Sequence, residues 1–230
     1  MRGLVMLEIQ QTKVRRNIHT ILVVVLGLAL FPPSLPAFQS VCDTADCSFV
    51  GVEKPWPDRP APSTSRFVIG VFELVLPDGW ERLTVLPDEH LRVEYSTKKS
   101  LGLAWQSVHS VGIPKELLTQ TSLHFADVPR LIFTKAPRDV VPKDAAEREL
   151  WAALFDLKRM TFRNASDPRI YRSDPVAAYT ARVNFGRYTS STYVTTSTFP
   201  THALMLLGSG VDQETIDSII GSVRLKDGFK

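Results

Sequence analysis

The chain of 230 residues is 44% hydrophobic and 22% charged, which is the balance of a globular protein rather than of a disordered or collagen-like one. Its net charge of +3 resides in residues 1–37, where four basic side chains stand against one acidic side chain, and the remainder is neutral. A nucleic-acid-binding surface needs clustered Lys and Arg. We therefore expect no nucleic-acid partner.

Residues 1–37 are predicted to be an export signal. A basic stretch at residues 13–16 precedes an apolar run over residues 21–31, and the prolines that follow end any helix. As a helix the run spans about 16 Å, whereas the hydrocarbon core of a bilayer is about 30 Å thick. With the small residue Ala37, this pattern is typical of a secretory signal peptide. A membrane anchor and a buried N-terminal helix are the alternatives.

Two specialised export signals fit less well. The Arg-Arg pair at residues 15–16 resembles a twin-arginine signal, but residues 17–19 depart from its usual continuation. Lipidation of Cys42 would need a small residue before it, and Val41 stands there instead. We expect a periplasmic or other extracytoplasmic protein, either released or anchored in the inner membrane.

Residues 38–66 are predicted to be a linker that contains both cysteines, Cys42 and Cys47. After export these thiols would meet an oxidising compartment, where near neighbours pair, so we expect a disulfide between them. Reduced thiols are the alternative. A metal site would need two further ligands, and the segment has no His to supply one.

The second half of this linker is rich in proline. Four prolines within residues 55–62 favour an extended, semi-rigid spacer that holds the domain away from the membrane. The alternative is a ligand for a proline-binding partner, anchored by Trp56.

The body, residues 67–226, is predicted to be one domain that opens with strands. Residues 67–76 are apolar on both faces, as in a central strand. Residues 91–95 and 101–105 alternate between apolar and polar side chains, the pattern of strands with one wet face. Residues 114–125 are predicted to form a short helix, and a strand is expected over residues 130–134.

The second part of the body begins with a helix that Asp144 can cap, with Glu147 in the capping-box position. Strands are predicted over residues 176–185, 188–199 and 201–207. In the first of these, the side chains expected to share a buried face are Ala177, Tyr179, Ala181, Val183 and Phe185, opposite the wet face of Thr180, Arg182 and Asn184.

A last helix is capped by Asp212 and has Gln213 on its exposed side, opposite a buried stripe made of Ile216, Ile219, Ile220 and Val223. Strands in hairpins with separate helices predict an α+β domain, in which an antiparallel sheet is flanked by helices.

The run of Ser and Thr at residues 189–198 is the most unusual composition in the body. As a strand it would place Tyr193 on one face with Thr195. A solvated strand is one interpretation, because Thr tolerates β geometry. The alternative is a polar edge strand that adds a strand of a partner.

Both ends of the body resemble one family. Residues 72–80, which end in Pro-Asp-Gly-Trp, look like the strand and turn that open the PsbP, Mog1 and DcrB-like superfamily. Residues 203–207 followed by residues 219–225 resemble the strand and helix that close it. The resemblance implies an α/β/α sandwich and a non-catalytic accessory role. Because the superfamily shares no active site, it implies no catalytic residues.

No stretch of the sequence carries a catalytic, cofactor or metal motif. The nucleophile elbow and the phosphate-binding glycine loops are absent, and His90, His109, His124 and His202 are dispersed. We therefore expect no catalytic, cofactor-binding or metal-binding residues. The hypothesis is a non-enzymatic exported protein that binds another envelope protein. The alternatives are an exported hydrolase or metal-dependent enzyme, with a site built from His109, His124 and Asp127, and a purely structural membrane-associated protein.

Overall fold

A computed structural model describes residues 45–58, 65–86 and 90–228. All of them belong to the unit Pro36–Lys230, and the other unit, Met1–Leu35, lies outside the described residues. The predicted export signal and Cys42 therefore also lie outside them. Within the described ranges, no helix is both long and apolar enough to cross a membrane.

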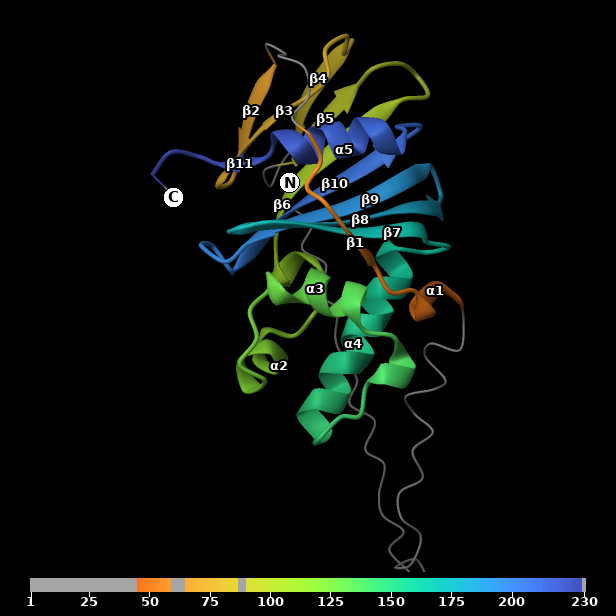
Figure 1. Ribbon diagram of the computed structural model, residues 1–230, viewed down its shortest axis with the longest axis vertical. Coiled ribbons are helices and arrows are strands. Elements are labelled where there is room, and N and C mark those ends of the chain that lie inside the picture. The colour runs from red at the N-terminus through yellow and green to blue at the C-terminus, as the bar shows by residue number, and fades with distance from the viewer. Residues whose placement is uncertain (1–44, 59–64, 87–89, 229–230) are drawn as a thin grey trace, which may run out of the picture. The chain divides into compact units, whose positions relative to one another are not determined.

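A large sheet organises the domain (Figure 1). Its strand order is β1-β7-β8-β9-β10-β6-β5-β4, and every neighbouring pair is antiparallel except β1 with β7. The strands are β1 (Val52–Lys54), β4 (Arg82–Leu86), β5 (His90–Glu94), β6 (Ser100–Ser107), β7 (Ser166–Ser173), β8 (Val176–Phe185), β9 (Tyr188–Thr196) and β10 (His202–Ser209).

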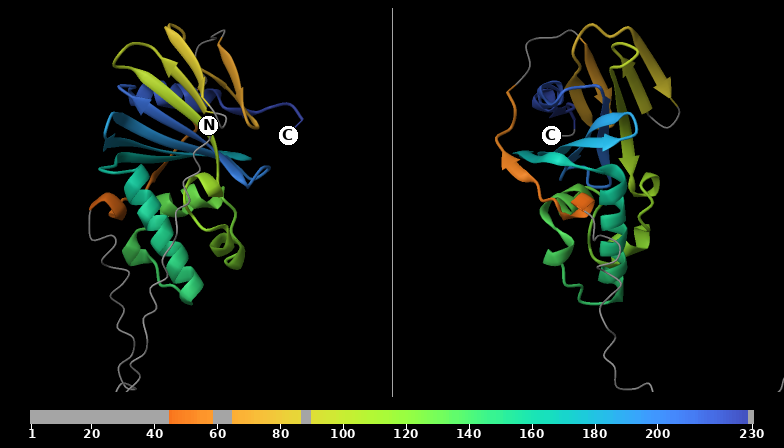
Figure 2. Two further views of the ribbon diagram at one scale, coloured as in Figure 1. Left: turned by 180° about the vertical axis from the view of Figure 1, so that it is seen from behind. Right: turned by 90° about the vertical axis from the view of Figure 1, so that its right-hand side faces the viewer.

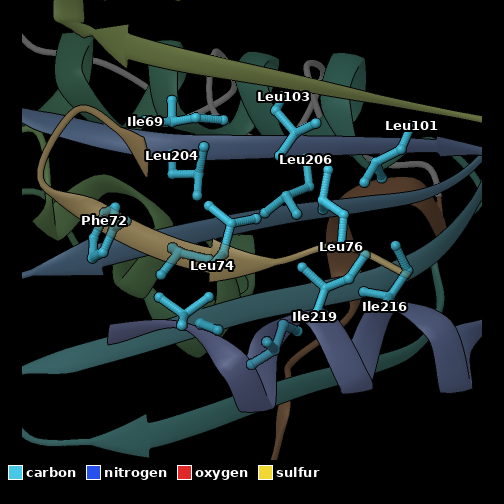
Figure 3. Packing of buried hydrophobic residues seen from close by; sticks show 14 of the residues in the cluster. Ile69, Phe72, Leu74, Leu76, Leu101, Leu103, Leu204, Leu206, Ile216 and Ile219 are labelled. Carbon is cyan, nitrogen blue, oxygen red and sulfur yellow. The ribbon is translucent and has the colours of Figure 1, made fainter. Parts of the chain in front are cut away.

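One face of this sheet is covered by α5 (Gln213–Ser222) and by a small sheet with the order β11-β3-β2 (Figures 1 and 2). The small sheet consists of β2 (Arg66–Ile69), β3 (Phe72–Val75) and β11 (Arg224–Leu225). Figure 3 shows Leu74 and Leu76 beside Ile216 and Ile219 of α5. These side chains meet Leu204 and its neighbours on the large sheet and form one hydrophobic core.

The opposite face carries the remaining helices and a second core, which we call the helix-side core. The helices are α1 (Ala45–Ser48), α2 (Lys115–Gln120), α3 (Asp127–Thr134) and α4 (Ala145–Thr161), with single 3-10 turns at Val108–Ser110 and Pro137–Asp139. Asp144 caps α4 as predicted, because its Oδ1 accepts a hydrogen bond from the Glu147 amide at 2.8 Å. The α+β class with a mostly antiparallel sheet is confirmed, although a small sheet shares one covering layer with α5.

The segment at residues 67–76 forms a hairpin of β2 and β3 in the small sheet, so the prediction of one central strand was wrong. Gly70 makes the turn with a φ of +58°, a conformation that favours glycine. A Cβ at this position would also lie 2.4 Å from the Trp105 ring, which reaches the turn from β6. The second misplaced strand, residues 130–134, belongs to α3. Short apolar runs fit either element, and here Asp127 begins a helix.

Two side chains of β8 differ in burial from the sequence prediction, because layers cover both faces of the large sheet. Tyr179, Ala181 and Val183 face the helix-side core, as expected, whereas Phe185 is exposed. Thr180, assigned to a wet face, is 0% exposed because α5 and the small sheet cover that side. The large sheet is therefore buried on two sides where it carries β8.

The Ser- and Thr-rich strand β9 is neither solvated nor an edge. It lies between β8 and β10, and its residues from Ser190 to Thr196 are buried. The hydroxyl of Thr192 lies 2.7 Å from that of Thr180 on the neighbouring strand, in hydrogen-bonding contact. Such cross-strand pairs let hydroxyl groups be buried within a sheet.

Part of the predicted linker belongs to the fold. Residues 52–54 are β1, the strand that pairs with β7, and Trp56 packs against the core that includes residues of α5. A Cβ on Gly221 of α5 would collide with the carbonyl oxygens of Pro57 and Asp58, so the chain crosses this helix at a glycine. Residues 55–58 thus lie against the domain.

Candidate binding groove and sheet edge

The three residues proposed for an alternative catalytic or metal site do not form one. Asp127 Oδ2 accepts a hydrogen bond from the backbone N–H of His124 at 3.0 Å, and its Oδ1 pairs with Arg130 at 3.0 Å. Asp127 therefore serves the start of α3. His109 lies exposed in the 3-10 turn after β6, and no interaction joins it to the other two among the described residues. The described ranges hold no group of three or more His, Cys, Asp or Glu that could bind a metal ion.

Cys47 is 0% exposed and packs against Phe155 of α4, with its Sγ 3.7 Å from the Phe155 carbonyl oxygen. Because Cys42 lies outside the described residues, the disulfide between the two cysteines stays a prediction.

A polar cluster joins β7 to α5. Asp217 Oδ2 pairs with Arg169 Nη1 at 2.6 Å, while its Oδ1 accepts hydrogen bonds from the Tyr171 hydroxyl and the Gln213 side-chain amide, each at 2.9 Å. Asp167 pairs with the other end of the same guanidinium. Gln213 is only 4% exposed, so its assignment to the exposed side of the last helix was wrong.

The electrostatics of this cluster are those of a structural contact. The Arg169 guanidinium lowers the pKa of Asp167, and burial raises the pKa of Tyr171. Both shifts keep each group in its ordinary ionisation state near neutral pH. A general base needs a free carboxylate or imidazole, whereas the carboxylates of Asp167 and Asp217 both pair with Arg169 and the cluster contains no imidazole. We conclude that it fastens α5 to the sheet.

A groove with a volume of about 250 Å³ lies on the face of the large sheet that carries the helix-side core. Its floor consists of Gly102 and Ala104 on β6. On β10, Leu207 pairs in register with Gly102 and Met205 with Ala104. Because Ala104, Leu207 and Tyr188 pack against the helix-side core, the groove extends from that core towards the solvent.

The far side of the groove is basic. On β5, Arg92 pairs in register with Gly102 and His90 with Ala104. Arg187, from the β8–β9 turn, lies over the ring of Tyr188 with its guanidinium carbon 5.3 Å from the ring centre. No Asp or Glu among the described residues lines the groove.

One carboxylate close by belongs to Glu94, which lies between two guanidinium groups. Its Oε1 is 3.0 Å from Arg92 Nε, and its Oε2 accepts a hydrogen bond from Arg82 Nε at 2.6 Å. One carboxylate thus faces two cations, which leaves a net positive charge beside the groove. At one end of the groove, Gln106 Oε1 is buried and has no hydrogen-bond partner among the described residues.

The strand β4 beyond this groove is an edge of the large sheet with exposed apolar side chains. No described strand pairs with its outer side. Leu83 is 38% exposed, Leu86 42% and Val85 76%. Leu86 faces the groove, and Leu83 and Val85 face the opposite side, where they pair in register with Val93 and Leu91.

Sequence reasoning identified none of these binding features. The groove combines residues of three strands whose alignment depends on strand order and register, which the sequence pattern does not specify. Residues 82–86 do carry an apolar signal, Leu-x-Val-Leu, that could have identified β4.

Comparison with known proteins does not assign the chain to a family. No protein family matches the sequence, and no curated protein matches it. A crystal structure from Bacteroides thetaiotaomicron VPI-5482 aligns with 73% of this chain at 6% identity and a TM-score of 0.30. The aligned part covers 51% of that protein, so the chain spans about half of its length.

Proposed function

We propose that this chain is a non-enzymatic binding protein of the cell envelope, which takes an extended segment of another envelope protein along β4. The observation that carries the proposal is the open edge of β4 with its exposed apolar side chains. An edge strand offers unpaired backbone donors and acceptors, so an extended peptide can add to it as a further strand.

The two edges of the large sheet, β1 and β4, differ in how well they are protected against strand addition. There β1 has only three residues, two of them the charged Glu53 and Lys54, and Pro55 and Pro57 follow. Short length, charge and proline are the devices with which proteins protect an edge from unwanted pairing. The β4 edge has five residues and keeps Leu83, Val85 and Leu86 exposed, although Arg82 and Glu94 place a charge pair near its start.

The surroundings of β4 define the chemistry of the segment. Leu83 and Val85 face one side of the sheet, where they would contact apolar residues of an added strand. On the other side Arg92 and His90 pair in register with Thr84 and Leu86. A strand that alternates apolar with acidic residues would complement both sides.

Two further parts of the proposal rest on the sequence. Export follows from the signal-like residues 1–37, and an alkaline-phosphatase fusion active only outside the cytoplasm would support it. Membership of the PsbP, Mog1 and DcrB-like superfamily is supported by contact between the two segments that carry the resemblance. Arg224 and Leu225 of β11 pair with Glu73 and Phe72 of β3.

The experiment that tests strand addition is site-specific photo-crosslinking in the producing cells. A photoreactive residue is placed at Leu83 in one variant and at Val85 in another. Both should capture the same partner peptide, and the captured position should shift by two residues between the variants. That shift is the signature of a strand in register, with about 3.3 Å per residue.

The matched control is Val52 on β1, which is 54% exposed and lies on the opposite edge. It should capture no specific peptide. Captured positions that do not move in step with positions 83 and 85 would contradict strand addition. Adducts that join two copies of this chain through β4 would replace the partner by a second copy and overturn its proposed identity.

A further inference from the structure

We propose that the groove over Gly102 and Ala104 binds a small organic anion, namely a carboxylate on an apolar body. The proposal rests on the groove floor and on its two walls. It shares His90 and Arg92 with the proposed function, but it does not require strand addition at β4. The floor and the two walls each come from a different strand of the large sheet, so the site exists only in the folded protein.

The floor is flat because its two central positions carry almost no side chain. A Cβ added to Gly102 would find its nearest neighbour, the Leu207 carbonyl oxygen, at 3.8 Å. Glycine is therefore not required there by crowding, and its φ is not in the left-handed region. Glycine in the interior of a strand otherwise weakens it, and often marks a place where another molecule approaches the backbone.

The two walls differ in chemistry, and this difference defines the ligand. Met205 and Leu207 form an apolar wall that continues into the helix-side core. Across the floor, His90 and Arg92 form a basic wall, and Arg187 stands at the rim. A ligand that lies across the strands can therefore place its apolar body on β10 and its negative charge towards β5.

Size and polarity restrict the ligand further. A volume of about 250 Å³ is below the usual range of ligand pockets, about 300–1,000 Å³, so the ligand is small. Gln106 Oε1 is a buried acceptor at one end of the groove, and a hydroxyl or N–H group of the ligand could donate a hydrogen bond to it. Guanidinium groups bind carboxylates with directed hydrogen bonds, which favours a carboxylate as the anion.

The test uses 4-phenylbutyrate as the probe, with 4-phenylbutanol and 4-phenylbutylamine as its neutral and cationic counterparts. Binding to the full-length protein is measured by ligand-observed NMR titration. We expect saturable binding of the carboxylate, with an affinity at least about 10-fold above that of the alcohol, because a hydrogen bond to a charged group is stronger than one between neutral groups. The amine should not bind.

Three variants locate the binding. Gly102→Leu should abolish it, because the new side chain fills the groove. Arg92→Gln combined with Arg187→Gln should lower carboxylate affinity about 10-fold and leave alcohol affinity unchanged, because the neutral alcohol makes no charged hydrogen bond with either guanidinium. Both side chains lie outside the two cores, so the variant should fold. Val52→Lys, at the opposite edge of the large sheet, should leave carboxylate affinity unchanged.

Each alternative result would overturn the proposal. Absence of saturable binding would exclude the site, and equal affinities for the acid and the alcohol would exclude an anion site. Carboxylate binding that survives Gly102→Leu would place the ligand elsewhere. If Gly102→Leu does not fold, the double arginine variant decides, since unchanged carboxylate affinity in it is incompatible with the basic wall. Failure of crosslinking at β4 has no bearing on any of these measurements.

Discussion

The Ser222 hydroxyl accepts a hydrogen bond from the backbone N–H of Val75 at 2.9 Å and lies 3.3 Å from the carbonyl oxygen of the same residue. The two residues are 147 positions apart. Val75 ends β3, and Ser222 ends α5, so one side chain ties the opening of the domain to its close. The hydroxyl satisfies the Val75 N–H, and its own single proton can be donated to the Ile219 carbonyl oxygen at 2.6 Å.

The first prediction concerns this contact. Ser222→Ala removes the acceptor of the Val75 N–H and should lower the free energy of unfolding by about 1–2 kcal/mol. Denaturant unfolding measures the change. Ser218→Ala, on the same helix and without a side-chain hydrogen bond to a described residue, should stay within about 0.5 kcal/mol. Equal effects of the two substitutions would show that the tie contributes nothing.

The second prediction compares two buried residues of α5. Ile219 is 1% exposed, and Ile219→Ala should lower the free energy of unfolding by about 2–5 kcal/mol, since it leaves a cavity. Gln213→Ala should cost less, about 1 kcal/mol, because it removes one hydrogen bond to Asp217 but also a buried carbonyl oxygen without a described partner. Denaturant midpoints at constant slope measure both. A neutral Gln213→Ala would agree with the sequence prediction and contradict the structure.

These comparisons show where sequence patterns were sufficient and where they were not. The stripe from Ile216 to Val223 and the inward face of Tyr179 and Ala181 were predictable, because each follows from the period of a single element. Gln213 and Thr180 were predicted to be solvent-exposed, because a polar side chain is usually exposed. Both are buried by layers contributed from distant parts of the chain, which no local pattern reveals.

The groove is the extreme case of this limit. Gly102, Leu207 and Arg92 form one row across three strands only because of strand order and register. In the sequence, Gly102 is an isolated glycine and Arg92 a residue on a predicted wet face. The groove forms only in the folded protein, when β10 from the last part of the chain pairs with β6.

The third prediction tests the buried hydroxyl pair on the central strands. Thr192→Val should destabilise the protein by about 1–3 kcal/mol, because the Thr180 hydroxyl keeps its burial and loses its partner. The double variant Thr180→Val with Thr192→Val should recover most of that loss, since no polar group remains unsatisfied. Denaturant unfolding of both single variants and the double variant forms the cycle. Additive effects in this cycle would mean that the two hydroxyls do not interact.

The fourth prediction concerns the cysteines. If Cys42 and Cys47 pair after export, alkylation of the unfolded protein without reductant should add no mass, and alkylation after reduction should add two alkyl groups. Unfolding is needed because Cys47 is buried against Phe155 and would resist labelling in the native protein. Two alkyl groups added before reduction would contradict the disulfide.

The fifth prediction concerns Lys158, a lysine of α4 that is 0% exposed. Its Nζ donates hydrogen bonds to the carbonyl oxygens of Phe49 at 2.6 Å and Lys135 at 2.9 Å, and it lies 4.1 Å from the centre of the Phe49 ring. Burial lowers the pKa of Lys158 to about 8. A neutral amine has two N–H groups, which are enough for both carbonyl oxygens, so deprotonation keeps the contact.

The direction of the pH effect follows from the two pKa values of Lys158. Between pH 8 and the unfolded value of 10.5, the unfolded chain binds more protons than the folded protein, so stability rises with pH in this window. From pH 7 to pH 10 the contribution of Lys158 should increase the free energy of unfolding by about 2 kcal/mol. Urea unfolding at both pH values, compared with Lys158→Met, isolates this contribution. The variant should lack the rise, and a rise of equal size in both proteins would show that Lys158 keeps its ordinary pKa.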